Sequence, residues 1–396
     1  MKIASAVVNL VGTENTVRHL VMQLRQELGD GPIDLLILFG SAHFEGDLEK
    51  IAPELQEALS PRTFIGCTAD AVIRDDQEYE HQPGLVAWAA RMPGTRCVSF
   101  HLSQDDLARL DTPEALREHL NVPADESPYF VLLGDPFSAN PIQLLDRINT
   151  AYPRRPAIGG MASAGEQPEQ NVLVFEGQTL RHGTVGVALW GNVEMDTIVS
   201  QGCRPIGRHL VVTKAENNII HQLGGKPTLA AVNEILNECP QSDIDLAKKR
   251  GLLIGCVINE YMKTFGSGDF LIRNPISIDE KSGAMAVNDM MRTGQTVQFH
   301  VRDSQSAAED LQYLLSVKAT EPAAGALLFS CNGRGSRFFP DRHHDARAVV
   351  DGRSQMPVAG FFCAGEIGPV GNRNFLHGFT ASIGFFRPTN GDHGGG

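Results

Sequence analysis

The chain has 396 residues, of which 42% are hydrophobic and 20% charged, a composition typical of a globular protein with room for two or three domains. Lysines and arginines number 34 against 47 aspartates and glutamates, a formal net charge of −13, which disfavours nucleic acid and anionic membranes as partners. The sequence has no membrane-length apolar run, no signal-peptide core and no CxxC pair among its seven cysteines, so a cytoplasmic protein with reduced thiols is expected.

The first predicted elements are a helix and a strand. Apolar residues recur at helical spacing from Val17 to Leu28, and Gly29 follows as a stop signal. A continuous apolar run at 35–41 then predicts a strand that is buried on both faces.

This strand opens a pattern that occurs three times along the chain. Each copy has an apolar strand ending in a loop, a helix-like stretch, a short strand ending in glycine, and a strand that returns. The first strands lie at 35–41, 130–135 and 326–331, the second strands end at Gly66, Gly159 and Gly360, and the returning strands lie at 84–88, 186–190 and 378–382. The pattern predicts a mixed α/β fold in which repeated β-α-β-β units form helix-covered sheets.

Residues 196–322, between the second and third copies, follow a different pattern. Strands are predicted at 210–212, 218–220, 252–257, 270–272 and 297–301, with helices near 228–236 and 304–315. This middle region is expected to form a mostly antiparallel sheet with helices.

The densest set of reactive and polar residues ends the first strand of the third copy. Cys331, Asn332, Gly333, Arg334 and Gly335 follow a buried strand directly. Strand ends of α/β sheets are common ligand sites, glycines let backbone N–H groups approach an anion, and arginine binds carboxylate or phosphate. The alternative is a tight turn with a surface arginine.

Further candidates follow the second strand of the third copy. Glu366 could orient Arg334, bind an amine or act as a base, although Glu166 in the second copy stands at a matching place in the sequence. Arg373, Asn374 and His377 come next as possible polar contacts, and a structural histidine is an equal alternative for His377.

In the middle region, Arg273 and Arg302 place cationic groups at strand ends, and Arg302 could simply form a capping ion pair. Cysteine catalysis is a separate hypothesis, in which Cys331 is the nucleophile and His377 or His300 its base. A small buried thiol is the alternative for Cys331. No metal site is predicted.

Three segments resemble the FIST proteins, which pair a FIST N with a FIST C domain: ALLFSCNGRG at 326–335, PVAGFFCAGEIG at 357–368 and NFLHGFTAS at 374–382. The resemblance predicts a FIST N-like domain over 30–228 and a FIST C-like domain over 229–386. The terminal segment RPTNGDHGGG predicts a disordered tail over 387–396. The resemblance implies an intracellular sensory protein for signal transduction that binds a small ligand, with amino acids proposed. One branch of the family senses nitric oxide through haem, but no residue here maps to its axial ligand.

Three hypotheses result. In the first, the protein binds a small, amino-acid-like or otherwise anionic ligand through Arg334 and the Gly333 and Gly335 backbone, with Glu366 on the amine and Asn332 or His377 nearby; the output would pass through a partner protein. In the second, it is a Cys331-dependent acyl transferase or hydrolase. Haem-based sensing is a minor third reading, and otherwise no cofactor is expected.

Overall fold

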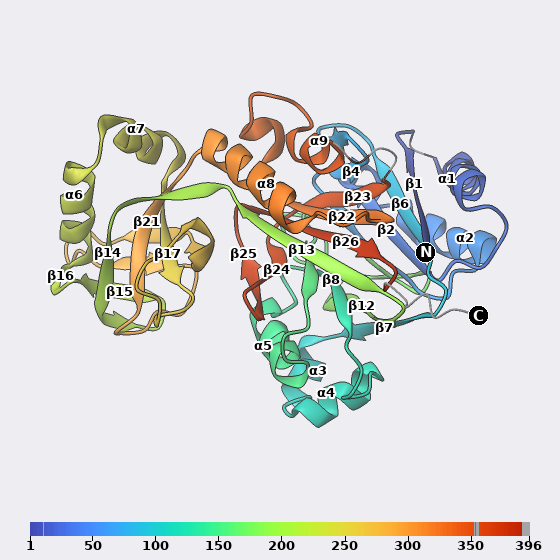
Figure 1. Ribbon diagram of the computed structural model, residues 1–396, viewed down its shortest axis with the longest axis horizontal. Coiled ribbons are helices and arrows are strands. Elements are labelled where there is room, and N and C mark those ends of the chain that lie inside the picture. The colour runs from blue at the N-terminus through green and yellow to red at the C-terminus, as the bar shows by residue number, and fades with distance from the viewer. Residues whose placement is uncertain (11, 352, 354–355, 390–396) are drawn as a thin grey trace. The chain divides into compact units, whose positions relative to one another are not determined.

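The computed structural model describes residues 1–10, 12–351, 353 and 356–389, and these fall into two compact units (Figure 1). The first unit contains Met1–Val199, Gln312–Leu376 and the described residues from Thr380 onward, and the second contains Ser200–Leu311 and His377–Phe379. The predicted change of domain between 228 and 229 therefore falls inside the second unit. The predicted mixed α/β class is confirmed, and the second unit corresponds to the predicted middle region.

The three predicted copies lie in the first unit, except for residues 200–201, 304–311 and 377–379 of copy three. Copy one contains β1 (Lys2–Val8), α1 (Thr13–Leu28), β2 (Leu35–Ser41), η1 (Ala42–Phe44), α2 (Leu48–Leu59), β3 (Phe64–Ala69), β4 (Val72–Arg74), β5 (Gln77–Tyr79) and β6 (Leu85–Arg91). Copy two contains β7 (Thr95–Leu102), α3 (Gln104–Arg109), α4 (Pro113–Leu120), β8 (Tyr129–Gly134), α5 (Pro141–Ala151), β9 (Ala157–Met161), β10 (Leu173–Phe175), β11 (Gln178–Leu180) and β12 (Thr184–Gly191). Copy three contains β13 (Glu194–Gln201), α8 (Ser304–Lys318), β22 (Gly325–Cys331), η3 (Gly335–Arg337), α9 (His344–Val350), β23 (Val358–Cys363), β24 (Glu366–Val370), β25 (Arg373–His377) and β26 (Thr380–Arg387).

Strand pairing is the same in each copy. The first strand pairs in parallel with the second strand and antiparallel with the returning strand: β2 with β3 and β6, β8 with β9 and β12, and β22 with β23 and β26. In each copy an additional strand, which comes before the first strand in the sequence, pairs with the returning strand and extends the sheet; these strands are β1, β7 and β13. The repeat is therefore longer than the sequence predicted.

Each copy also gives a two-stranded hairpin to the sheet of another copy. The hairpin β4–β5 of copy one pairs with β23 of copy three, β10–β11 of copy two pairs with β3 of copy one, and β24–β25 of copy three pairs with β9 of copy two. This cyclic exchange means that no copy completes its sheet without another one. It also brings residues far apart in the sequence into one sheet.

The glycines that align the copies have a common structural role. A Cβ at Gly66, Gly159 or Gly360 would lie 2.4, 1.9 or 1.7 Å from the carbonyl oxygen of a leucine on the neighbouring first strand. A side chain would therefore collide with main-chain atoms in all three sheets. These glycines give an exact register in which other positions of the copies can be compared.

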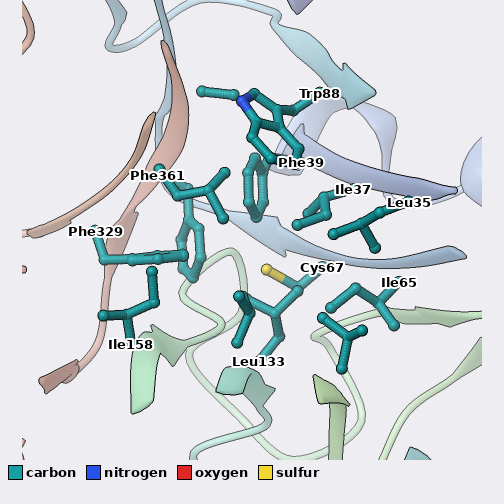
Figure 2. Packing of buried hydrophobic residues seen from close by; sticks show 14 of the residues in the cluster. Leu35, Ile37, Phe39, Ile65, Cys67, Trp88, Leu133, Ile158, Phe329 and Phe361 are labelled. Atoms are coloured by element: carbon teal, nitrogen blue, oxygen red, sulfur yellow. The ribbon is translucent and has the colours of Figure 1, made fainter. Parts of the chain in front are cut away.

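The inner faces of the three sheets share one hydrophobic core. Alternate residues of β2, β8 and β22 point into it, and Figure 2 shows Phe39, Phe329 and Phe361 together with Cys67 and Trp88 from neighbouring strands. The rings of Phe329 and Phe361 lie 5.6 Å apart, edge to face. The intervening residues of the first strands point outward, where α1 and α2 cover β2 and where α4 and α5 cover β8.

The helix signals were largely correct. The α1 stripe is buried and the helix ends at Leu28. In α5 the side chain of Asn140 accepts a hydrogen bond from the Gln143 amide, as an N-cap does. Among the described residues, no helix is both long and apolar enough to cross a membrane.

The second unit is built on a separate antiparallel sheet. Its elements are β14 (Cys203–Glu216), β15 (Ile219–Leu223), β16 (Lys226–Pro227), α6 (Thr228–Glu238), α7 (Gln241–Arg250), β17 (Leu252–Val257), η2 (Ser267–Asp269), β18 (Phe270–Arg273), β19 (Pro275–Ile278), β20 (Met285–Val287) and β21 (Thr296–Arg302). The strand order is β18-β17-β21-β14-β15-β20-β19 with β16 beside β15, and the pairs are antiparallel as predicted.

The start of the predicted disordered tail is wrong. Arg387 is the last residue of β26, and its guanidinium forms ion pairs with Glu194 and, at 3.1 Å, with Asp196. Residues 390–396 lie outside the described residues.

Candidate functional site

A group of buried polar side chains lies where β22 of copy three ends. We call it the third-copy cluster; it consists of Ser330, Cys331, Arg334, Asp345, Glu366 and Thr380. The side chains come from the end of β22 and its loop, from the start of α9, from the start of β24 and from the start of β26. All belong to the first compact unit. All except the half-buried Cys331 are buried.

Arg334 and Asp345 form the centre of this cluster. Both side chains are 0% exposed, and Nε and Nη2 of Arg334 donate to the Asp345 carboxylate at 2.7 and 2.8 Å. The Ser330 hydroxyl donates to the same carboxylate at 2.7 Å. Burial disfavours the charged form of Asp345, but the adjacent guanidinium holds the pKa of that carboxyl well below its usual range. Two ionised groups are therefore expected to persist in the protein interior.

This ion pair occupies one edge of the Arg334 guanidinium. The Nε–Nη2 edge, which would bind a ligand's acid group bidentately, already binds Asp345. The opposite nitrogen, Nη1, is buried and has no hydrogen-bond partner in the structure. A ligand would thus meet Arg334 through Nη1.

Glu366 has one satisfied and one unsatisfied oxygen. Its Oε2 accepts hydrogen bonds from the backbone N–H and the hydroxyl of Thr380 at 3.0 and 2.9 Å. Its Oε1 is buried without a hydrogen-bond partner. Burial raises the pKa of Glu366 to about 7, although Thr380, the Cys331 thiol and the Arg334 charge all act to lower it. The carboxyl is therefore divided between its neutral and ionised forms near neutral pH.

The unsatisfied atoms Nη1 of Arg334 and Oε1 of Glu366 give this cluster its chemical interest. Leaving a buried polar atom without a partner costs roughly 1–3 kcal/mol, so such atoms are usually met by water or a ligand. The two side chains are close enough for the charge of each to affect the other's pKa. The third-copy cluster thus contains one buried donor and one buried acceptor without hydrogen-bond partners.

The other two copies have no carboxylate at the position of Glu366. In each sheet, the residue that follows the aligned glycine pairs with a residue of the exchanged hairpin. These pairs are Phe361 with Val72, Cys67 with Leu173, and Gly160 with Glu366. Val72 and Leu173 are fully buried apolar residues. Glu366 is therefore a departure from the repeated scaffold.

The comparison with Glu166 made from the sequence was wrong. Glu166 is exposed, and its backbone N–H donates to Gln170 in a surface turn. Sequence spacing aligned the two Ala-Gly-Glu segments, but strand register aligns Glu366 with Leu173. The apparent counterpart does not weaken the case for Glu366.

The loop after Cys331 is held from both sides. The backbone N–H of Asn332 donates to the Cys363 carbonyl at 2.9 Å, and that of Arg334 donates to the Cys331 carbonyl at 2.9 Å. Gly335 has a φ of +60°, and a Cβ there would lie 2.7 Å from the Glu80 carboxylate. That carboxylate accepts from the Ser336 backbone and hydroxyl.

A second buried carboxylate supports this loop from the hairpin of copy one. Oε1 of Glu78 accepts the backbone N–H groups of Asp345 and Ala346, each at 3.1 Å, at the start of α9. Burial, together with the nearby Asp345 charge, raises the pKa of Glu78 to about 8. The hairpin exchange thus places residues from the N-terminal part of the sequence behind the third-copy cluster.

Two predicted site residues make structural contacts elsewhere in the first unit. The Asn374 side chain accepts from the Ala157 amide at 2.8 Å and donates to Asn149 and to the Arg155 carbonyl, which ties β25 to α5 and β9. Arg373 forms an ion pair with Asp146 at 3.0 Å on the surface.

Arg273, Arg302 and His377 belong to the second unit. Arg273 is buried and pairs with Asp289. Arg302 donates to the Asn274 side chain at 2.9 Å and lies over the Phe379 ring, with a separation of 4.7 Å. His300 is also in this unit, where burial lowers its pKa to about 4. Neither proposed histidine base is in the unit that contains Cys331.

Sequence reasoning missed Ser330, Asp345 and Thr380. Ser330 and Thr380 lie within the FIST-like segments 326–335 and 374–382, so membership of these segments was a usable signal. Asp345 had no such signal, because only the tertiary structure brings the start of α9 to the end of β22. Among the described residues, no group of three His, Cys, Asp or Glu side chains could hold a metal ion.

Comparison with known proteins finds similarity over most of the chain. The family model of the FIST N domain matches residues 34–226, and that of the FIST C domain matches residues 229–369. Uncharacterized protein Rv0628c of Mycobacterium tuberculosis strain H37Rv is 36% identical over 389 residues, which are 98% of this chain and 100% of that protein. Uncharacterized protein Mb0898c of Mycobacterium bovis is 36% identical over 92% of this chain and 93% of its own length. The chain therefore belongs to the FIST family and carries both a FIST N and a FIST C domain.

Proposed function

We propose that this protein is a sensory protein that binds a small, amino-acid-like ligand at the third-copy cluster. FIST domains are generally taken as sensory domains that bind small ligands in signal transduction. The observation that carries the proposal is the pair of buried atoms without partners, Nη1 of Arg334 and Oε1 of Glu366. They supply a donor for an acid group and an acceptor for an amine.

Each part of such a ligand has a physical reason to bind. A carboxylate oxygen would accept from Nη1 of Arg334, a charge-assisted contact worth roughly 1.5–3 kcal/mol. An ammonium group would donate to Oε1 of Glu366 and would favour the ionised form of that carboxyl. Cys331, Asn332, Gly333 and Gly335 would line the approach.

Access requires the loop to open, because both Arg334 and Glu366 are fully buried. The loop is tied to the first copy by Glu80, which binds Ser336, and by Asp70, which pairs with Arg337 at 2.9 Å on the surface. Exposed contacts of this kind contribute little stability, so they can break at low cost. Ligand binding would thereby be coupled to the position of a surface loop, which a partner protein could read.

The test uses a matched pair of glutamates. Proteinogenic L-amino acids, acetate and succinate are screened by thermal shift, and any that raise the melting temperature are titrated by calorimetry. Glu366→Gln removes the charge while keeping an oxygen for Thr380, and Glu166→Gln is the control in the exposed segment with the same local sequence.

We expect an amino acid to bind the parent protein and the Glu166→Gln variant equally, and to bind Glu366→Gln at least tenfold more weakly. Affinity for the parent should rise from pH 6 to pH 8, because the Glu366 pKa is about 7 and the amine binds the ionised form. Equal affinity in the two variants, or no binding by any probe, would contradict the proposal.

The Cys331-dependent enzyme is a second candidate, with one contact in its favour. The Cys331 thiol lies within hydrogen-bonding reach of the Glu366 carboxyl, which could accept its proton. Alkylation of Cys331 by iodoacetamide at neutral pH should then be faster than that of the half-buried Cys97, and faster than in Glu366→Gln. Haem binding stays a prediction of the resemblance, and no contact in the third-copy cluster supports it.

A further inference from the structure

Two cysteines stand opposite each other at the ends of adjacent parallel strands. Cys331 is the last residue of β22, Cys363 is the last residue of β23, and the two are partners in the strand register. We propose that Cys331 and Cys363 form a reversible disulfide when the protein meets a hydroperoxide. This modification site shares Cys331 and Glu366 with the third-copy cluster, but its oxidation does not require a bound ligand.

The backbone geometry suits such a bond. Neighbouring strands lie about 4.8 Å apart, and disulfides join Cα atoms that are about 4.4–6.8 Å apart. The N–H of Asn332 donates to the Cys363 carbonyl at 2.9 Å, so the strands are still paired at this level. A disulfide requires the two Cβ atoms to move slightly closer together. Because both residues are the last in their strands, this movement disturbs few hydrogen bonds between the strands.

The side chains also point to the same face. Phe329 and Phe361 are two residues before the cysteines, their rings are in contact, and both belong to the central core. Side chains two positions apart in a strand share a face, so the thiols of Cys331 and Cys363 are neighbours as well. The Cys331 thiol is also close enough to affect the ionisation of Cys363, since it is among the groups that raise the pKa of Cys363.

The surroundings give the two thiols different roles. Cys331 is half-buried, whereas Cys363 is fully buried and occupies space left by the missing side chain of Gly160. A peroxide can therefore reach Cys331 first, and Cys363 is held beside it as the resolving thiol. Cys67 also neighbours Cys363 in the core but is itself fully buried.

The chemistry balances with hydroperoxide as the oxidant. Glu366 accepts the Cys331 proton, the thiolate attacks the peroxide O–O bond, and a sulfenic acid and water form once the proton has passed to the departing oxygen. The Cys363 sulfur then attacks the sulfenic sulfur, forming the S–S bond and releasing a second water. In total, two thiols and one hydrogen peroxide give one disulfide and two waters.

The experiment is peptide mapping of the full chain after hydrogen peroxide treatment and quenching with N-ethylmaleimide. We expect the peptides containing Cys331 and Cys363 to be linked, and dithiothreitol to separate them. In Cys363→Ala the link should be lost, and dimedone should label Cys331 at least tenfold more than in the parent. Cys97→Ser is the control, and it should leave the link unchanged.

Cys331→Ser covers the case in which Cys363→Ala does not fold, because the half-buried position tolerates serine and Cys363 should then stay reduced. The proposal is overturned if Cys331 is oxidised to sulfinic acid while Cys363 remains fully alkylatable after unfolding. It is also overturned if the link joins Cys67 to Cys363. None of these outcomes depends on whether an amino acid binds.

Discussion

The second and third copies of the repeat use the end of the same strand in different ways. In copy two, Asp135 is buried at the end of β8 and accepts hydrogen bonds from the neutral side chains of Ser138 and Asn171. At the equivalent place in copy three, Cys331 belongs to a cluster that contains the buried Arg334–Asp345 ion pair and the buried Glu366 carboxyl. Nη1 of Arg334 and Oε1 of Glu366 have no hydrogen-bond partner there. The scaffold needs only the first arrangement, so the second is the better candidate for a function.

Features shared by all three copies and features confined to one copy differ in what they contribute to the protein. Features common to all copies, such as the aligned glycines, maintain the sheets. Features confined to one copy, such as Glu366 where the others have Val72 and Leu173, cost stability without building the scaffold. Matched substitutions in the different copies can test that distinction.

Replacing Asp345 by asparagine should be the most damaging change. It leaves the Arg334 charge buried without its counter-ion, which costs about 3–5 kcal/mol. Asp135→Asn in copy two should cost only about 1 kcal/mol, because its donors are neutral. Urea unfolding of both variants measures the difference. The double variant Arg334→Met with Asp345→Leu should recover most of the loss, and similar costs for the two single variants would refute the contrast between the copies.

The free energy of unfolding should depend on pH because the buried Glu366 carboxyl of copy three titrates near neutral pH. Folding raises the Glu366 pKa from 4.5 to about 7, so the folded state binds a proton more tightly than the unfolded chain does. Its stabilising contribution is therefore complete below about pH 4.5 and is lost as the pH rises through 7. At about 1.4 kcal/mol per pKa unit, the loss is on the order of 3 kcal/mol.

Unfolding free energies between pH 4.5 and 8 measure this effect in the parent and in Glu366→Gln. The decline should be shallower in the variant, and Glu166→Gln should retain the parent slope. Identical slopes in all three proteins would show that the Glu366 carboxyl does not titrate as proposed. Glu78, whose pKa is raised to about 8, should continue the decline to higher pH.

The packing of the loop after Cys331 can be tested by replacing two glycines that share a φ of +60°, Gly335 in this loop and Gly371 elsewhere in copy three. Alanine at Gly371, which has open space around its Cβ position, should cost about 1 kcal/mol for backbone strain alone. Alanine at Gly335 adds a collision with Glu80 and Phe362, and we expect about 1–3 kcal/mol more. Thermal unfolding compares them, and equal losses would mean that the loop yields easily.

Much of the fold could be predicted from the sequence. Continuous apolar strands and recurring glycines identified the three copies and most element positions, because burial and turn geometry are local constraints on residue type. The hairpin exchange could not be predicted, since β4, β10 and β24 are too short to indicate which sheet they join.

The sequence by itself also determined that Cys331, Arg334 and Glu366 were the residues to examine. Only the tertiary structure decided what they do, because Asp345 takes one edge of Arg334, and strand register, not spacing, separates Glu366 from Glu166. The physical reason is that the partner of a buried charge is chosen by packing between elements far apart in the chain. The sequence specifies which side chain carries each charge, but the folded structure specifies which group neutralises it.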